Sequence, residues 1–195
     1  MKVVGVGCGP GMLTEEAIRV IAAATEIYGS RRAIELATPH IPTRARVHEL
    51  GEYRHLRELP AHAVLLSTGD PMLAGLGMAG SEVVPGISSL QIAAARLRLP
   101  IACFSVVSAH GKDHAGAIAE ASGELARGRC VFLLSDPSFD PGLLARALAA
   151  GGEGCRIAVC ERLGYPDERI SVGSACDPPA ACSGLFVIVI WKEPE

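Results

Sequence analysis

The chain has 195 residues, of which 49% are hydrophobic and 20% are charged. That length and composition predict one large or two small globular domains with a sizeable core, and they exclude a disordered chain. A formal net charge of −3 and an aromatic content of 4% argue against a general nucleic-acid-binding protein, which needs a basic face and aromatic side chains for stacking.

Apolar runs alternate with helical patterns along the whole chain, which predicts an α/β fold. In the first half, four apolar runs predict strands, and the third of them runs on into a loop: residues 2–7, 26–30, 64–71 and 82–86. Thr14 stands at the N-cap position of a helix whose first turn carries Glu15 and Glu16. Ser88 or Ser89 starts a second helix, which ends before Pro100.

The second half repeats this alternation. Its apolar runs predict five strands: residues 104–111, 130–136, 156–164, 168–173 and 184–192. Helices are expected at 113–126 and at 141–150, where Pro141 lies in the first turn. Because no helix separates the last two strands, we expect them to form an antiparallel edge. The pattern favours two α/β halves, residues 1–100 and 101–195, joined near Pro100.

The least regular segment, residues 37–62, is rich in basic side chains interleaved with glutamates. Its basic residues are Arg44, Arg46, Arg54, Arg57, His40, His48, His55 and His62. One interpretation is a surface for an acidic substrate. A solvated helix face with mixed charges is the favoured interpretation.

Seven cysteines raise the question of metal or redox chemistry: Cys8, Cys103, Cys130, Cys155, Cys160, Cys176 and Cys182. None lies in a C-x-x-C pair, and their spacing does not match zinc-binding patterns. The chain opens directly on a strand-like run without a signal peptide, and its longest apolar run, residues 185–191, is too short to span a bilayer. We therefore expect a cytoplasmic protein with reduced thiols used as small apolar residues.

Three turns with unusual chemistry each follow a predicted strand. The first is VVGVGCGPGMLT (3–14), the second is STGDPMLAGLG (67–77), and the third is PGISSLQ (85–91). In a parallel sheet, turns that follow strands share the carboxyl edge, where α/β proteins bind ligands. Bare glycine backbone, hydroxyl groups and the carboxylate of Asp70 suit a small polar cofactor with amino, carboxylate and adenosine groups.

Taken together, these three turns resemble the signature of the tetrapyrrole methylases, which use S-adenosylmethionine. The opening motif of that family is similar to GVGCGPGMLT, its second loop to STGDP, and its third to PGISS. Within the family, residues 105–113 and 159–170 are most similar to members that methylate a corrin precursor at ring carbon C5.

The resemblance implies two α/β subdomains of the tetrapyrrole methylase type, with S-adenosylmethionine in the cleft between them. It implies an enzyme of cobalamin biosynthesis that forms a homodimer and works beside a separate decarboxylating C15-methyltransferase. Apolar cover for the strand at 184–192 would support the dimer. Catalysis would rest on proximity, with no metal bound by the protein, and any cobalt would arrive inside the substrate.

The expected site residues fall into two groups. Residues expected to hold the cofactor are Gly69, Asp70, Leu73, Gly75, Ser88, Ser89, Leu134, Ser135, Cys160 and Leu163. Residues expected to orient the tetrapyrrole are His110, Pro10 and Lys112, with His114 nearby. Histidine and lysine can meet the many carboxylates of such a macrocycle by charge-assisted hydrogen bonds.

Three other functions compete with this one. A Rossmann-like methyltransferase also uses G-x-G-x-G, but the acidic residue two positions before that motif is replaced by Gly5. A dinucleotide-dependent oxidoreductase needs an acid at the end of the second strand, which here ends in Tyr28, Gly29 and Ser30. A non-catalytic corrinoid- or cofactor-binding protein is the third possibility.

Two features depart from the family pattern. Met12 follows Gly11 where the family usually has aspartate. The segment 76–82 is too short for the full helix that usually precedes the next strand. We therefore expect a thinner layer on the first domain.

Overall fold

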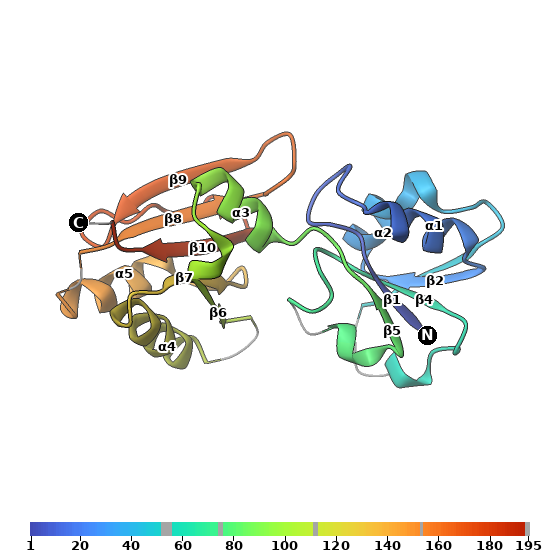
Figure 1. The fold of residues 1–195 in the computed structure, drawn as a ribbon, viewed down its shortest axis with the longest axis horizontal. Helices are drawn as coiled ribbons and strands as arrows, with labels where there is room; N and C mark the ends of the chain where they lie inside the picture. The colour runs from blue at the N-terminus through green and yellow to red at the C-terminus, as the bar shows by residue number, and fades with distance from the viewer. Residues whose placement is uncertain (52–55, 74–75, 111–112, 153, 194–195) are drawn as a thin grey trace. The chain divides into compact units, whose positions relative to one another are not determined.

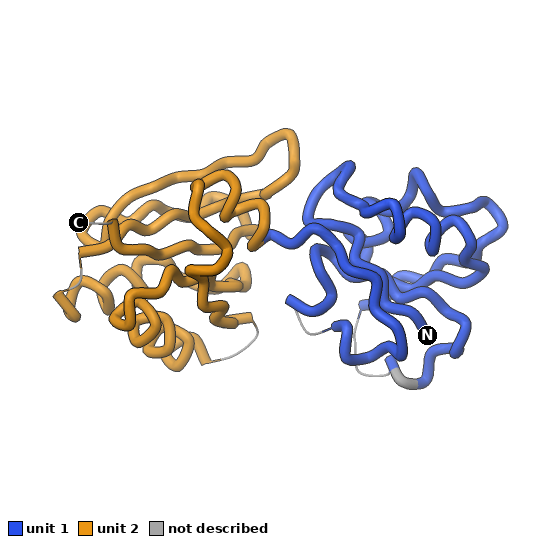
Figure 2. The backbone as a smooth tube through the Cα atoms, in the orientation of Figure 1, with its two compact units in different colours: residues 1–89 blue, residues 90–195 orange. Residues whose placement is uncertain are grey.

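The computed structural model of the protein describes residues 1–51, 56–73, 76–110, 113–152 and 154–193. By its contacts the chain divides into two compact units, Met1–Ser89 and Leu90–Glu195 (Figure 2). The structure is α/β with one five-stranded sheet in each unit, which confirms the expected fold class. The division lies just inside helix α3 (Ser89–Leu97), whereas the sequence pattern placed it near Pro100.

The first unit carries a parallel sheet of strand order β3-β2-β4-β1-β5 (Figure 1). Its strands are β1 (Lys2–Gly5), β2 (Glu26–Gly29), β3 (Arg46–Glu49), β4 (Val64–Ser67) and β5 (Glu82–Val84). Its helices are α1 (Glu15–Ala23) and α2 (Arg31–Ala37), with 3-10 turns at Thr38–His40, Leu56–Glu58 and Leu76–Ala79. The central strands β1 and β4 are buried, as their unbroken apolar runs require.

Side-chain caps fix where the helices of this unit begin. The hydroxyl of Thr14 accepts the N–H of Ala17 at 3.1 Å, which confirms the predicted start of α1. Ser30 does the same for α2 through the N–H of Ala33 at 3.2 Å. Between the second loop and β5 stands the short 3-10 helix Leu76–Ala79 in place of a full helix. The layer on this side of the sheet is therefore thin, as expected.

The segment 37–62 is not the helix face that its charges favoured. It contains β3, an edge strand whose four residues are all exposed, and the short turns Thr38–His40 and Leu56–Glu58. The segment is exposed to solvent as expected, but its charged residues at 46–49 lie on a β-strand and not on a helix. Within it, Arg54 and His55 lie outside the described residues.

The second unit holds a mixed sheet of strand order β6-β7-β10-β8-β9. Its strands are β6 (Phe104–Ser108), β7 (Cys130–Leu134), β8 (Arg156–Glu161), β9 (Arg169–Ser174) and β10 (Phe186–Trp191), and a 3-10 turn at Ile101–Cys103 precedes β6. Strands β6 and β7 run parallel, and β10 runs antiparallel to β7 and to β8. Helices α4 (His114–Ala126) and α5 (Pro141–Ala150) pack on one face of this sheet through its largest apolar cluster.

The final strand β10 is where the sequence prediction fails. We expected β9 and β10 to form an edge, but β10 lies between β7 and β8, and β9 alone is the edge strand beside β8. Phe186 to Ile190 are all buried, so both faces of β10 are covered within one chain. The argument that this strand needs cover from a second copy therefore does not hold.

The cysteines divide by position. Cys8, Cys155 and Cys160 are buried like small apolar residues, as expected, whereas Cys103 and Cys130 are half-buried. Cys176 and Cys182 are exposed, so the expectation of core thiols is wrong for them. Among the helices of the described residues, none is both long and apolar enough to cross a membrane.

Candidate functional site

The three glycine-containing loops follow β1, β4 and β5, which are adjacent in the first sheet and end at the same edge. The first two loops pair directly. The N–H of Val6 donates to the carbonyl of Ser67 at 2.9 Å, and the N–H of Gly69 donates to the carbonyl of Gly7 at 2.7 Å. The structure therefore brings the loops together at the carboxyl edge of the strands, where ligands of parallel sheets bind.

Glycines let the loop backbones approach more closely than side chains would allow. A Cβ atom on Gly86 would lie 2.2 Å from the carbonyl oxygen of Gly69 and 2.9 Å from the Cα of Gly5. A Cβ atom on Gly5 would lie 2.6 Å from the backbone nitrogen of Gly86. Gly5, Gly69 and Gly86, one from each loop, are in close backbone contact. A larger residue at Gly5 or Gly86 would push the loops apart.

Asp70 joins the second loop to the third. Its Oδ1 accepts the N–H of Met72 at 2.8 Å, and its Oδ2 accepts the N–H of Gly86 at 3.0 Å. The hydroxyl of Thr14 also donates to the carbonyl of Pro85 at 3.4 Å, which ties the first loop to the third. The carboxylate of Asp70 is thus already used as an acceptor by two backbone N–H groups, and its role is to hold the loops in shape.

Gly69 is a buried turn residue at this edge, and its N–H is used in the bond to Gly7. This residue has a φ of +69°, which favours glycine. Among the described atoms that the loop packs against, a Cβ there would come within 4 Å of the Cα of Ser88 alone, at 3.9 Å. The second loop therefore packs close to Ser88, just before α3, with no side chain of Gly69 between them.

The other cofactor residues expected in the first unit lie in the second and third loops. Leu73 is half-buried, and its N–H donates to the carbonyl of Asp70 at 3.2 Å. Ser88 is buried and Ser89, the first residue of α3, is half-buried. Gly75 lies outside the described residues. The contact of these residues with a cofactor stays a prediction.

The first loop closes on itself through sulfur contacts. A Cβ on Gly7 would lie 2.5 Å from the Cβ of Met12, and the Sγ of Cys8 lies 3.7 Å from the Sδ of Met12. Met12 therefore packs against the inner side of its own loop, where an aspartate was expected from the family pattern. Pro10 is exposed at the tip of this loop.

The expected cofactor residues of the second unit also gather at one sheet edge. Leu134 and Cys160 are both paired with Val187 of β10, so their side chains share the face opposite α4 and α5. The hydroxyl of Ser135 donates to the carbonyl of Phe186 at 2.7 Å, and Leu163 is buried. Burial, with a smaller effect of Glu168, raises the pKa of Cys160 to about 12, so this thiol is neutral and acts as apolar wall.

The loop after β6 carries the residues expected to orient the tetrapyrrole. Its backbone is held by the N–H of Ala109, which donates to the carbonyl of Leu134 at 2.8 Å, and His110 beyond it is exposed. His114 is different, because its Nε2 lies 3.1 Å from Oδ2 of Asp136 and its ring packs edge-on against Phe139. The ring of His114 is therefore committed to a carboxylate of its own chain. Lys112 lies outside the described residues.

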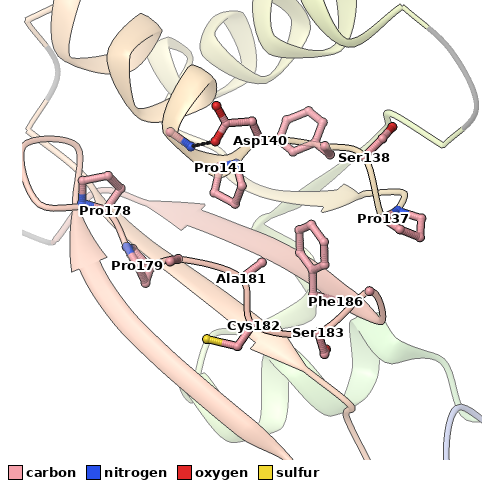
Figure 3. A pocket seen from close by; sticks show the side chains of 14 residues that line it. Pro137, Ser138, Asp140, Pro141, Pro178, Pro179, Ala181, Cys182, Ser183 and Phe186 are labelled. Carbon is pink, nitrogen blue, oxygen red and sulfur yellow. Dashed lines mark hydrogen bonds between the residues drawn. The ribbon is translucent and has the colours of Figure 1, made fainter.

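A cavity of about 510 Å³ opens elsewhere in the second unit, between residues 137–142 and 178–184 (Figure 3). Four prolines and Phe186 form much of its wall. The carboxylate of Asp140 beside it accepts the N–H of Gly142 at 2.8 Å, as a cap of α5. None of the expected cofactor residues lines this cavity. The glycine loops remain the candidate site, because they bring the expected cofactor residues Gly69, Asp70 and Ser88 close together.

A cluster of titratable groups lies at the opposite, amino edge of the first sheet. Glu26, buried at the start of β2, accepts from the hydroxyl of Tyr28 at 2.8 Å and from the guanidinium of Arg46 at 3.3 Å. The Nε2 atoms of His62 and His48 lie 3.0 and 3.3 Å from its oxygens. The hydrogen bond from Tyr28 is the largest effect that lowers the pKa of Glu26. Arg46, His48 and His62 therefore contact Glu26 within the chain, which counts against a basic surface for an acidic substrate built from these three residues.

Sequence reasoning missed how Gly5 and Gly86 act. Both were seen as members of glycine-rich turns, but their contact across β1 and β5 was not expected. The available signal was a glycine at the last position of a strand and another directly after the next strand of the sheet, where close backbone approach is common. The pairing of His114 with Asp136 was also missed, although both residues follow neighbouring parallel strands.

Comparison with known proteins gives one consistent family. The model of the tetrapyrrole (corrin/porphyrin) methylases matches residues 2–177. The crystal structure of a cobalamin biosynthesis precorrin-6Y methylase from Archaeoglobus fulgidus is 31% identical, with a TM-score of 0.75, and the match covers 100% of this chain and 98% of that one.

Two curated relatives are similar over shorter parts of their length. A precorrin-6Y C(5,15)-methyltransferase [decarboxylating] of Sinorhizobium is 32% identical over 185 residues, which are 88% of this chain and 44% of the relative. A cobalt-precorrin-7 C(5)-methyltransferase of Salmonella typhimurium is 32% identical over 116 residues, or 55% of each chain. The chain thus spans about half the length of these curated relatives.

Proposed function

Because the chain belongs to the tetrapyrrole (corrin/porphyrin) methylases, we propose that it is an S-adenosylmethionine-dependent C-methyltransferase that acts on a corrin precursor in cobalamin biosynthesis. The substrate we propose is cobalt-precorrin-7, methylated at ring carbon C5, the reaction in the name of the Salmonella relative. The observation that carries the proposal is the contact among three loops at the carboxyl edge of β1, β4 and β5, where the carboxylate of Asp70 fixes the second loop to the third.

The residues present fit the cofactor. When bound, S-adenosylmethionine supplies a methyl group on a positively charged sulfur, which a nucleophilic ring carbon can accept. The chain contributes the surface on which that molecule is oriented. We propose that the backbone at Gly69 and the hydroxyls of Ser88 and Ser89 hold it, and that Asp70 keeps the second loop in place through Gly86.

The chemistry asks mainly for positioning. A methyl transfer in which carbon, methyl and sulfur lie in line can gain on the order of 7–11 kcal/mol from orientation alone. A site made of backbone joints and few titratable groups is suited to that task, because it is rigid and holds its geometry without a proton-transfer residue. His110, exposed beyond β6, is proposed to orient a carboxylate of the macrocycle.

A second candidate is the double methylation with decarboxylation named for the Sinorhizobium relative. The matched 185 residues cover 44% of that protein. For this chain we propose one methyl addition, at C5, the reaction in the name of the Salmonella relative. The removal of the acetate carboxyl and the methylation at C15 are proposed for a separate partner protein.

Mass spectrometry of a turnover mixture tests the proposal. The purified chain is incubated with S-adenosylmethionine and cobalt-precorrin-7, with a reaction lacking the chain as control. We expect the corrin to gain one methyl group and to keep its acetate carboxyl. Loss of carbon dioxide in a parallel reaction supplied with precorrin-6Y, the substrate in the name of the Sinorhizobium relative, would support the second candidate. Tight binding of both ligands without any methyl gain would show a binding protein that does not turn over.

We also propose a homodimer, as the resemblance implies. The apolar strand β10 does not contribute to this proposal, because it is buried inside its own unit. Light scattering at micromolar protein concentration tests it, and a monomer mass would contradict it.

A further inference from the structure

Two cysteines meet at the amino ends of β6 and β7. Cys130 is the first residue of β7 and pairs in register with Phe104, the first residue of the parallel strand β6. Cys103 directly precedes Phe104, at the end of the 3-10 turn Ile101–Cys103. The two Sγ atoms lie 2.7 Å apart. Their side chains therefore point at each other across the strand pair.

The backbone around this pair is held in place by Arg129. Its guanidinium donates to the carbonyl of Ala102 at 3.0 Å and to the carbonyl of Phe104 at 2.9 Å, on either side of Cys103. The pairing of β6 with β7 fixes the backbone at Cys130, and the hydrogen bonds from Arg129 fix the turn that carries Cys103. Together they hold the two sulfur atoms close to each other. A disulfide needs Cβ atoms that face each other across a short distance, and both conditions are set by the backbone here.

Small reagents can reach the pair. Cys103 and Cys130 are half-buried, whereas Cys155 and Cys160 in the same unit are buried. The pair also lies at the end of β6 and β7 opposite to Ser108 and Leu134, where these strands carry their functional loops. A covalent change at the pair therefore leaves those loops untouched.

We propose that Cys103 and Cys130 form a redox-active dithiol, which a low-molecular-weight disulfide such as oxidised glutathione converts into an intramolecular disulfide. One thiol, after losing its proton, attacks the glutathione disulfide, forms a mixed disulfide and releases one reduced glutathione. The second thiol then attacks the mixed disulfide, forms the bond between the two Sγ atoms and releases the other. The two protein thiols are oxidised, and one glutathione disulfide is reduced to two thiols.

The two cysteines take different roles in this exchange. Burial, reinforced by the hydrogen bond with Cys103, raises the pKa of Cys130 to about 12. The thiolate is the reacting species, so the raised pKa disfavours Cys130 as the first attacking group. The bond closes the chain from 103 to 130, a segment that contains α4, and limits its freedom in the unfolded state.

Peptide mapping of the wild-type protein tests the proposal directly. The reduced protein is treated with oxidised glutathione at about pH 8.5, near the ordinary thiol pKa, and then alkylated and digested with trypsin without reduction. Cleavage separates peptide 99–112, whose single cysteine is Cys103, from peptide 130–146, whose single cysteine is Cys130. We expect these two peptides joined, with the loss of two hydrogen atoms relative to their sum.

Two variants complete the test. Cys103→Ser should abolish the joined peptide, and Cys176→Ser, which removes an exposed thiol, should leave it unchanged. Oxidation should raise the melting temperature of the wild type and of Cys176→Ser by on the order of 5 °C, and that of Cys103→Ser not at all. Recovery of Cys103 and Cys130 as free thiols, as separate glutathione adducts or in bonds to other cysteines would overturn the proposal.

Discussion

The two edges of the first sheet differ in a way that separates binding from stability. The amino edge holds a buried carboxylate, Glu26, surrounded by Tyr28, Arg46 and two histidines. The carboxyl edge holds three loops with glycines in contact and one carboxylate, Asp70, that accepts two backbone N–H groups. The amino edge is rich in charged groups that contact one another, whereas the carboxyl edge is poor in charge and is built from backbone contacts between loops.

This difference explains why titratable groups alone are a poor guide here. The rings of Tyr28 and His48 are stacked at 4.5 Å, and the pair joins β2 to the exposed edge strand β3. Since β3 has no buried side chain, these contacts add to the backbone ladder that holds it to β2. We therefore propose that the amino edge serves stability and the carboxyl edge cofactor binding.

The largest effect is expected from Gly86→Ala. The new Cβ would lie 2.2 Å from the carbonyl oxygen of Gly69, so the second and third loops must separate. We expect a loss of about 2–4 kcal/mol in the free energy of unfolding, the range of strongly disruptive substitutions. S-adenosylmethionine should bind at least about a hundredfold more weakly, or ~2.7 kcal/mol, by calorimetry.

The matched control for this change is Gly51→Ala. Gly51 is exposed, and a Cβ there meets nothing within 4 Å among the described atoms. The free energy of unfolding of Gly51→Ala should differ from that of the wild type by less than about 0.5 kcal/mol. If Gly86→Ala were as stable as this control and bound the cofactor normally, the close contact between the loops would contribute neither to stability nor to cofactor binding.

Asp70→Ala tests the carboxylate at the same joint. Both N–H partners lose their acceptor, yet the strands stay intact, so we expect a folded protein whose dissociation constant for S-adenosylmethionine rises about tenfold, or ~1.4 kcal/mol. Asp140→Ala is the matched control, because Asp140 also accepts the N–H two residues later. That variant should lose about 1 kcal/mol of helix capping and keep its cofactor affinity. Equal affinities for the two variants would refute the role given to Asp70.

His110→Ala extends the comparison to the second unit. His110 is exposed and is proposed to meet a carboxylate of the tetrapyrrole. Steady-state kinetics should show kcat/KM for the tetrapyrrole lowered about tenfold, or ~1.4 kcal/mol. The dissociation constant of S-adenosylmethionine should not move. A loss of cofactor binding and thermal stability with normal turnover by the folded fraction would make His110 a structural residue.

Glu26→Gln should change stability and leave binding alone. The pKa of Glu26 is lowered from 4.5, so its contribution to stability is present above pH 4.5 and is lost as the pH falls through the lower, folded-state value. Urea unfolding should show Glu26→Gln less stable than the wild type at neutral pH, with the difference shrinking below pH 4.5. Cofactor affinity should be unchanged, and a weakened affinity would break the division between the two edges.

Much of the fold follows from local signals in the sequence. Continuous apolar runs gave the positions of β4 and β7, and Thr14 gave the start of α1. Helix α2 and strand β3 were not predicted, because both are short and β3 has no apolar face to produce a period. The place of β10 in the middle of its sheet is a matter of strand order, which periodicity does not contain.

The site shows the same limit. The glycines and Asp70 could be selected from the sequence, because bare backbone beside a carboxylate after a strand is unusual chemistry. The hydrogen bond that the N–H of Gly86 donates to Asp70 could not be predicted, since it depends on β1 lying between β4 and β5. The pair formed by Cys103 and Cys130 likewise requires that β6 and β7 be neighbours in register.

Hydrogen–deuterium exchange with and without S-adenosylmethionine tests the assignment of the two edges most directly, because it reads the backbone amides themselves. The account predicts that the cofactor slows exchange in residues 67–73 and 85–89, and leaves residues 26–29 and 46–49 unchanged. Protection around Glu26 with none in the glycine loops, under conditions where binding is measured, would contradict it.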